Sequence, residues 1–178
     1  MSVLSENRKE TPFAVRDNAL DIRRQVTELC FRRFGKKPRK PPKEPSNWSD
    51  WSTESKQKWL DNQEVKRQQA EQFDEWFIAN ERAILDRLMR RMIFTIDQAN
   101  MINPQYIAEC DQQRLMQDEA IGLCGNLIRE LNYISETIPA NKNFIVKTVA
   151  YIDKEISMLR GWRKSCNETR KKIKNKQG

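Results

Sequence analysis

Apolar residues recur at intervals of three and four along two consecutive stretches between Met116 and Lys164. Such spacing places them on one face of an α-helix. The link between the stretches contains Pro139, which cannot continue a helix, and then Asn141 and Asn143, either of which can cap the next helix. Two amphipathic helices joined by so short a link lie antiparallel, so we expect a helical hairpin. The first stretch carries Met116, Ala120, Leu123, Leu127, Leu131, Ile134 and Ile138, and the second carries Ile145, Val149, Ile152, Ile156 and Leu159.

A third apolar stripe precedes the hairpin and predicts another long helix. The segment before this stripe, residues 61–72, is almost wholly polar. A helix there either bridges solvent or breaks near Asp61-Asn62. We therefore predict an all-α fold, an antiparallel (four-)helix bundle. The stripe comprises Phe73, Trp76, Phe77, Ile84, Leu88, Met92, Ile96 and Ala99.

The N-terminal part of the chain predicts a further helix outside this bundle. Asp17 can cap a helix that runs to about Phe34, and Gly35 is well placed to end it. Residues 36–45 contain four prolines, which forbid a helix and favour an extended, polyproline-like linker. We expect this linker to separate the first helix from the rest.

Four regions follow from these patterns. We expect an N-terminal segment with one helix, a basic Pro-rich and Trp-containing linker, a helical bundle, and a basic tail that is frayed or disordered. Their boundaries are 1–35, 36–52, 53–165 and 166–178.

Three tryptophans, Trp48, Trp51 and Trp59, lie within twelve residues of one another. They are candidates for a partner-binding site, because tryptophan is enriched at protein interfaces. They can equally dock the start of the following helix against the bundle, or stack on exposed nucleic-acid bases. The sequence leaves these alternatives open.

The residue types that carry most enzyme and metal chemistry are missing or scattered. The chain has no histidine, which is the commonest general base and metal ligand. Its four cysteines form no CxxC pair, and no glycine-rich phosphate-binding loop occurs. We therefore predict a protein that is not an enzyme and that holds no metal or cofactor. The cysteines are Cys30, Cys110, Cys124 and Cys166.

The net charge of +8 is concentrated in two segments. Residues 36–45 carry +4 and residues 163–178 carry +6, which leaves the remainder slightly negative. Clustered lysine and arginine side chains suit the phosphate backbone of RNA or DNA, although a solubilising tail on a protein-binding bundle is the plainer alternative. The candidate phosphate-contacting residues are Lys36, Lys37, Arg39, Lys40, Lys43, Arg163, Lys164, Arg170, Lys171, Lys172 and Lys174.

The sequence also bears on location. No uncharged run approaches the roughly 18 residues that a membrane span needs. The first ten residues lack the apolar core of a signal peptide. We expect a cytoplasmic protein with no membrane partner.

Three stretches resemble a known family: Gln117-Asp-Glu-Ala-Ile-Gly-Leu-Cys124, Leu127-Ile-Arg-Glu-Leu-Asn-Tyr-Ile134 and Met158-Leu-Arg-Gly-Trp-Arg-Lys-Ser165. They look like the four-helix-bundle proteins typified by the accessory variability determinant of diversity-generating retroelements. This group also includes the small proteins encoded in intervening sequences of bacterial 23S ribosomal RNA genes. The resemblance covers about residues 76–172.

The resemblance implies a bundle that assembles into a homopentamer, binds nucleic acid through basic surface and associates with a reverse transcriptase. The N-terminal helix, the Pro-rich linker and the tryptophan-containing stretch depart from the family pattern. The resulting hypothesis is a non-enzymatic, oligomeric accessory protein that binds RNA or DNA. The alternative is a scaffolding bundle that binds protein partners. A DNA-binding regulator is less favoured, because we find no helix-turn-helix spacing.

Overall fold

The computed structural model describes residues 13–177, so the predictions for residues 1–12 and Gly178 lie outside the described part. Within that part the fold is all-α, as the sequence predicts, with four α-helices and two short 3₁₀ turns. The helices are α1 (Ala14–Phe31), α2 (Thr53–Met101), α3 (Ile107–Thr137) and α4 (Lys142–Gln177), and the turns are η1 (Arg33–Gly35) and η2 (Trp48–Asp50).

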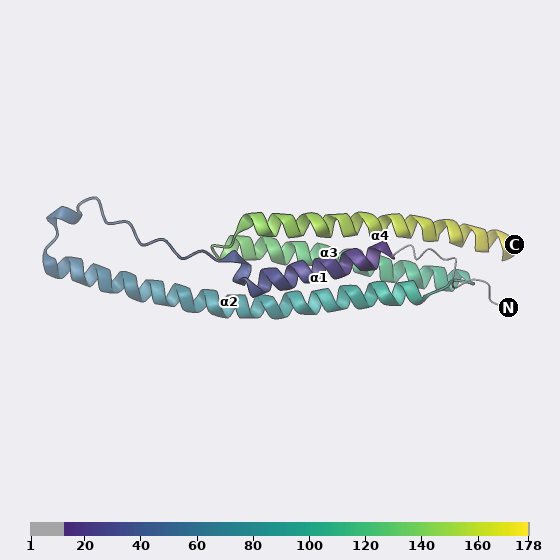
Figure 1. The fold of residues 1–178 in the computed structure, drawn as a ribbon, viewed down its shortest axis with the longest axis horizontal. Helices are drawn as coiled ribbons and strands as arrows, with labels where there is room; N and C mark the ends of the chain where they lie inside the picture. Colours follow the sequence, from purple (N-terminus) through teal and green to yellow (C-terminus); the bar gives the residue numbers. More distant parts are fainter. Residues whose placement is uncertain (1–12, 178) are drawn as a thin grey trace.

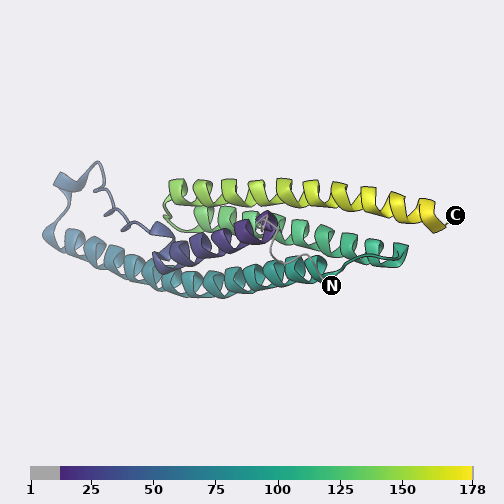
Figure 2. The ribbon, with the colours of Figure 1, turned by 45° about the vertical axis from the view of Figure 1, so that its right-hand side comes forward.

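The four helices form an elongated antiparallel bundle (Figures 1 and 2). Helix α1 packs against α2 and α4, and α3 packs against the same two helices from the other side. The predicted hairpin is present as α3 and α4. Helix α1, however, is part of the four-helix bundle. The sequence had predicted a helix outside the bundle, separated from it by the Pro-rich linker.

The core is built from the predicted stripes. Side chains from all four helices are fully buried in one cluster, for example Ile22, Met92, Leu127 and Ile152. Burying each such side chain stabilises the fold by roughly 1.5–3 kcal/mol, which explains why the stripes face one another. Between α3 and α4 the cap is Asn141, whose Oδ1 accepts a hydrogen bond from the backbone N–H of Asn143 at 3.1 Å.

Both ends of α1 are held by side chains that the sequence did not identify. The helix begins at Ala14, so Asp17 lies in its first turn and is not the cap we predicted. The start is extended because Phe13 packs edge-on against Trp162 of α4, with 5.1 Å between ring centroids. At the other end, Arg82 of α2 donates two hydrogen bonds to the carbonyl oxygen of Cys30, at 2.8 and 2.5 Å, and satisfies a free helix-end acceptor.

A left-handed turn follows α1 and closes one end of the bundle. Arg33, Phe34 and Gly35 have φ values of 53°, 55° and 63°. This conformation is held because the Phe34 side chain is fully buried and its carbonyl accepts a hydrogen bond from the N–H of Asn141 at 3.0 Å. The N–H of Lys37 donates to Pro139 O at 3.0 Å. The turn is therefore docked on the loop between α3 and α4.

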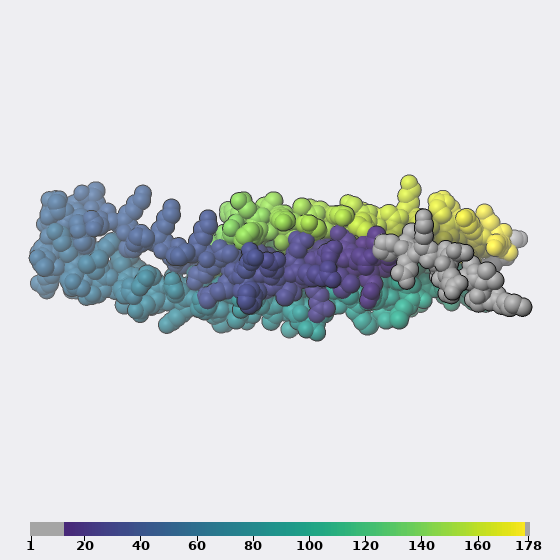
Figure 3. Space-filling view, in the orientation of Figure 1, coloured from purple at the N-terminus to yellow at the C-terminus, as the bar shows by residue number. Residues whose placement is uncertain are grey.

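Helix α2 extends well beyond the bundle. It is continuous through the polar residues 61–72, so of the two alternatives the solvent-exposed helix is present and the break near Asp61-Asn62 is not. Its first buried side chain is Asp74, which leaves residues 53–73, about 30 Å of helix, as a projection. Residues 36–47, here called the arm, run beside it in extended form (Figures 1 and 3). At about 3.1 Å per residue the arm reaches about 37 Å, which suits the span.

The C-terminal segment differs from its prediction. We expected a frayed or disordered tail after residue 165, whereas α4 continues as a helix to Gln177. Ion pairs between α4 and α3 account for the difference: Arg163 pairs with Asp118, and Arg170 pairs with Asp111 at 2.8 Å. Lysine and arginine also have good helix propensity, so the segment can remain helical with few apolar contacts.

Replacement of Gly35 should destabilise the fold. A Cβ at Gly35 would lie 2.7 Å from the Cβ of Asn141, and φ of +63° disfavours any L side chain. We expect Gly35→Ala to lower the free energy of unfolding by about 1–3 kcal/mol, measured by urea denaturation. Gly122→Ala is the control, because a Cβ at this helical position meets nothing within 4 Å. It should raise stability by about 0.5–1 kcal/mol. An equal effect of both substitutions would contradict the proposed strain.

Candidate nucleic-acid interface

The positive charge of the chain is concentrated on one helix. Helix α4 contains eleven lysine and arginine residues against three acidic ones. Its net charge of +8 equals that of the whole chain, so the remaining residues sum to zero. Seven of these eleven basic residues lie in the basic segment 163–178 that the sequence predicted, and the other four precede it. A count over the whole predicted helix, instead of over its tail, would have revealed the rest.

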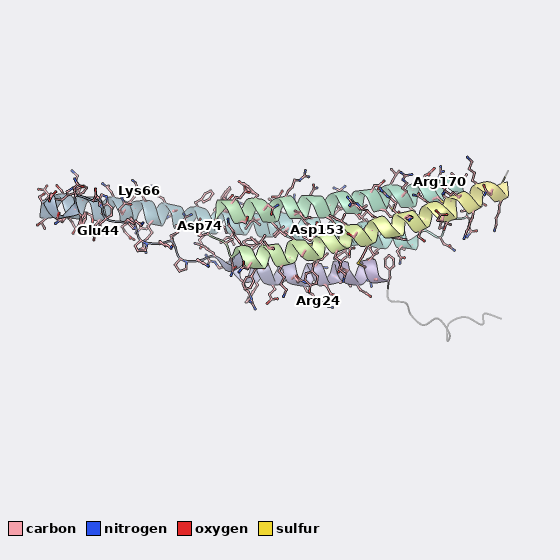
Figure 4. The ribbon with its side chains drawn as sticks, turned by 90° about the horizontal axis from the view of Figure 1, so that it is seen from above. Arg24, Glu44, Lys66, Asp74, Asp153 and Arg170 are labelled. Carbon is pink, nitrogen blue, oxygen red and sulfur yellow. The ribbon has the colours of Figure 1, made fainter. Side chains whose placement is uncertain are left out.

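Most of these side chains face outward. Figure 4 views the molecule from the α4 side, where the labels Asp153 and Arg170 mark the helix. The exposed acids on α4 are Asp153 and Glu168. The exposed basic residues are Lys142, Lys147, Lys154, Arg160, Lys164, Lys171, Lys172, Lys174 and Lys176. Exposed basic side chains therefore recur along the outer face of α4, which is about 54 Å long.

The two arginines predicted to bind phosphates near the C-terminus have internal partners. Arg163 pairs with Asp118, and Arg170 donates hydrogen bonds to both carboxylate oxygens of Asp111 at 2.8 and 3.3 Å. The hydrogen bond from Arg170 lowers the pKa of Asp111 below its ordinary value. These arginines attach α4 to α3. Lys171 forms an exposed pair with Glu168 at 3.5 Å, whereas Lys164, Lys172 and Lys174 have no ion-pair partner among residues 13–177.

The basic residues of the arm likewise include some that have ion-pair partners and some that have none among the described residues. Asp74 of α2 is fully buried, and both Lys36 and Arg39 pair with it, at 3.2 and 2.6 Å. Removing one member of a buried ion pair lowers the free energy of unfolding, so Lys36 and Arg39 hold the arm against α2. These two ion pairs are here called the Asp74 clamp. The other predicted residues of the arm are exposed and have no ion-pair partner in the described part of the chain: Lys37, Lys40 and Lys43.

The two predicted basic segments do not form one site. The arm leaves the bundle at the end where α4 begins, whereas the C-terminal end of α4 lies at the opposite end of the molecule (Figures 1 and 4). In Figure 4, Glu44 marks the arm, Lys66 marks the projection and Arg170 marks the other end of the molecule. One monomer therefore presents cations along its length and at both extremities.

The three candidate partner-binding tryptophans pack on one another at the tip of the projection. Trp48 contacts Trp51 and Trp59, with ring centroids 5.6 and 5.1 Å apart, and Lys56 lies over the Trp48 ring at 5.7 Å. All three indoles are partly exposed. Their contacts fasten η2, at the end of the arm, to the first turns of α2. Figure 1 shows η2 and the start of α2 away from the bundle, so the tryptophans do not dock the helix against it.

A second aromatic cluster was not identified as a site from the sequence. It lies at the junction between the projection and the bundle, where Phe77 is buried against Phe73 and Tyr133 at 5.8 and 5.5 Å. Trp76 is 63% exposed and its ring centroid lies 6.0 Å from that of Phe73. The exposed members, Phe73, Trp76 and Tyr133, form an apolar patch of α2 and α3, of the kind that marks protein contact sites.

The buried polar groups belong to the core. Glu155 is fully buried in α4, and its Oε2 accepts a hydrogen bond from Asn18 of α1 at 2.7 Å, while its Oε1 has no partner in the described residues. Burial raises the pKa of Glu155 to about 7, although the hydrogen bond from Asn18 opposes the shift. A solvent-borne substrate cannot reach this carboxyl group, so its role is structural.

Among residues 13–177, the side chains of metal-binding types, the cysteines and the apolar character of the helices do not extend the basic site. Residues 13–177 contain no group of three or more side chains placed to hold a metal ion. All four cysteines are free, and burial raises the pKa of the Cys124 thiol to about 12. Across the same residues, no helix combines the length and the apolar character that crossing a membrane requires.

The Glu155 carboxyl group should make stability depend on pH. The folded state keeps its proton up to about pH 7, whereas an unfolded chain releases it near pH 4.5. The folded state therefore binds more protons in this window, and stability falls as pH rises through it. We expect Glu155→Gln to be more stable than the wild type by about 3 kcal/mol at pH 8 and nearly equal in stability at pH 4.5.

Urea denaturation across pH 4.5–8 checks this expectation, with the range taken from the shift of Glu155. Glu136→Gln is a suitable control, because that side chain is exposed on α3. A parallel pH dependence of the Glu155→Gln variant and the wild type would show that the buried carboxyl does not carry the effect.

Comparisons of the chain with protein-family models, with curated proteins and with solved structures find no match. The resemblance to the retroelement accessory proteins therefore rests on the three quoted motifs alone.

Proposed function

We propose that this protein is a non-enzymatic accessory factor that binds nucleic acid through the outer face of α4. The observation that supports the proposal best is the net charge of +8 on that single helix, most of it on exposed side chains. Each phosphate that a lysine or arginine neutralises releases condensed counterions, which provides affinity without reading sequence. The free lysines of the arm, Lys37, Lys40 and Lys43, add a second contact region.

The different contacts of the arginine and lysine side chains support this proposal. Arginines such as Arg163, Arg170 and Arg39 are engaged with carboxylates of the fold. Lysines with no such partner within residues 13–177, such as Lys164 and Lys172, remain on the surface. A free exposed ammonium group can pair with a phosphate without breaking an internal contact, so binding need not disturb the bundle.

Two parts of the hypothesis rest on the family resemblance alone. One is the reverse transcriptase as a protein partner, and the other is a homo-oligomer, which would be a pentamer. An oligomer would multiply the basic faces and strengthen weak phosphate contacts through multivalency. Both stay predictions, as does the cytoplasmic location, and the proposed function covers RNA as well as DNA.

A salt series tests the proposed binding. We expect the affinity for nucleic-acid probes to fall linearly on a log–log plot with salt concentration, measured by fluorescence anisotropy. The triple variant Lys164→Gln, Lys172→Gln and Lys174→Gln should bind more weakly and reduce the slope by about 2–3, since each lost phosphate contact removes about 0.9.

Lys58→Gln with Lys66→Gln is the matched control, because both lysines are exposed on the projecting part of α2 and lie off the proposed surface. The control should keep the wild-type slope. An affinity that ignores salt, or that survives removal of the free lysines of both α4 and the arm, would exclude the proposed function.

A protein-binding scaffold is the second candidate, and the patch of Phe73, Trp76 and Tyr133 favours it. Exposed aromatic side chains often supply the main binding energy of an interface. On this alternative, Trp76→Ala should weaken a complex with a protein partner by about tenfold or more, in pull-down and calorimetry, while the α4 lysine variants leave it unchanged. The tip variants Trp48→Ala and Trp51→Ala test the other aromatic cluster. A complex that depends on the α4 lysines instead would count against the scaffold.

A further inference from the structure

The exposed cations of α4 fall into two rows. At 3.6 residues per turn, spacings of seven and eighteen residues return to the same side of a helix. Lys147, Lys154 and Lys172 therefore share one row, and Lys164 and Lys171 share another, which also contains Asp153, eighteen residues before Lys171. The strip between the rows carries mostly small side chains, namely Ala150, Ser157 and Gly161, followed by Glu168.

The distal half of α4 stands clear of α1. Helix α1 begins at Ala14, and the preceding Phe13 already packs beside Trp162 of α4. Residues 163–177 of α4 lie beyond that point and pack against α3, through the pairs of Arg163 and Arg170 (Figure 1). This part of α4 therefore presents its outer side, with Lys172 of the first row and Lys164 and Lys171 of the second.

We propose that α4 enters the major groove of duplex DNA, with one lysine row on each of the two phosphate backbones. An α-helix with its side chains is about 10–12 Å across, and the major groove of B-form DNA is about 12 Å wide. The small residues between the rows let the helix approach the groove floor. This inference rests on the proposed function and names the nucleic acid that α4 binds.

The same geometry argues against the other nucleic acids. The major groove of A-form RNA is too deep and narrow for a helix, so duplex RNA fits poorly. Single strands are usually held by bases stacked on aromatic side chains. The exposed aromatic patch of Trp76 and Tyr133 belongs to α2 and α3, and the outer side of α4 beyond Trp162 carries lysine and small polar residues instead.

Glu168 provides an internal check, because it is the only acidic residue after position 155. It lies on the strip between the rows and pairs with Lys171 at 3.5 Å. In the proposed complex its carboxylate faces the groove and pairs with Lys171, whose ammonium group would otherwise contact a phosphate. Removal of its charge should therefore tighten binding, an effect that damage to the fold does not produce.

The test compares three probes of one sequence, each about 20 nucleotides per strand: duplex DNA, duplex RNA and single-stranded DNA. Full-length protein should bind duplex DNA about tenfold more tightly than the other two, because only the B-form groove admits a helix. Glu168→Gln should increase the affinity for duplex DNA by about threefold to tenfold, because it removes a negative charge facing the phosphates and frees Lys171.

Gly161→Glu tests the strip directly. A Cβ at Gly161 would meet nothing within 4 Å. Glutamate also has a higher helix propensity than glycine, so the fold should tolerate the change. We expect duplex DNA binding to weaken about tenfold or more, because the new carboxylate would face the groove. Gly161→Ala is the matched control and should bind as the wild type does. Circular dichroism and thermal melting establish that both variants are folded.

The outcomes separate this inference from the proposed function. Equal affinity for all three probes, or binding that responds to the α4 lysine variants but not to Gly161→Glu and Glu168→Gln, would reject groove insertion while the proposed function stands. The absence of binding to every probe at low salt would reject both. A duplex DNA preference with opposite effects of Gly161→Glu and Glu168→Gln would support the inference.

Discussion

The packing of α1 against α2 and α4 is the constraint on which the rest of the structure depends. The hairpin of α3 and α4 with α2 leaves an apolar surface that α1 covers with Ala19, Ile22 and Val26. Covering it removes apolar area from water, which is the main favourable term of folding. The left-handed turn at Phe34 and Gly35 directs the chain out of the bundle, and its hydrogen bonds to the α3–α4 loop fix where it leaves.

The projection follows from that exit point. The chain leaves α1 at one end of the bundle and enters α2 some 30 Å beyond it, so an extended arm and an unaccompanied stretch of helix must lie side by side. Four prolines stiffen the arm, the Asp74 clamp holds its root and the tryptophan cluster fastens its tip. The prolines and two of the five basic residues of the arm therefore have a structural role, which leaves three cations of the arm free to bind a ligand.

Charge is arranged on the bundle according to what each cation contacts. Arginines such as Arg163 and Arg170 connect α4 to α3, and most of the exposed lysines lie along α4, where all except Lys171 have no ion-pair partner in the described residues. Arginine suits the first role because its planar guanidinium forms two hydrogen bonds with one carboxylate, as Arg39 and Arg170 do. The remaining lysines give α4 the surface on which both the proposed function and the duplex DNA inference rest.

The sequence by itself determined the helices, because apolar spacing of three and four is a local property, and it located the basic and aromatic residues. It did not determine the partners of those residues. Asp74 and Asp118 are distant in sequence from Lys36, Arg39 and Arg163, so only the tertiary structure separated clamps from free cations. The same reason explains two wrong predictions, the separation of α1 from the bundle and the disorder of the C-terminal tail. Long-range contacts hold both segments in place, and no local sequence pattern encodes such contacts.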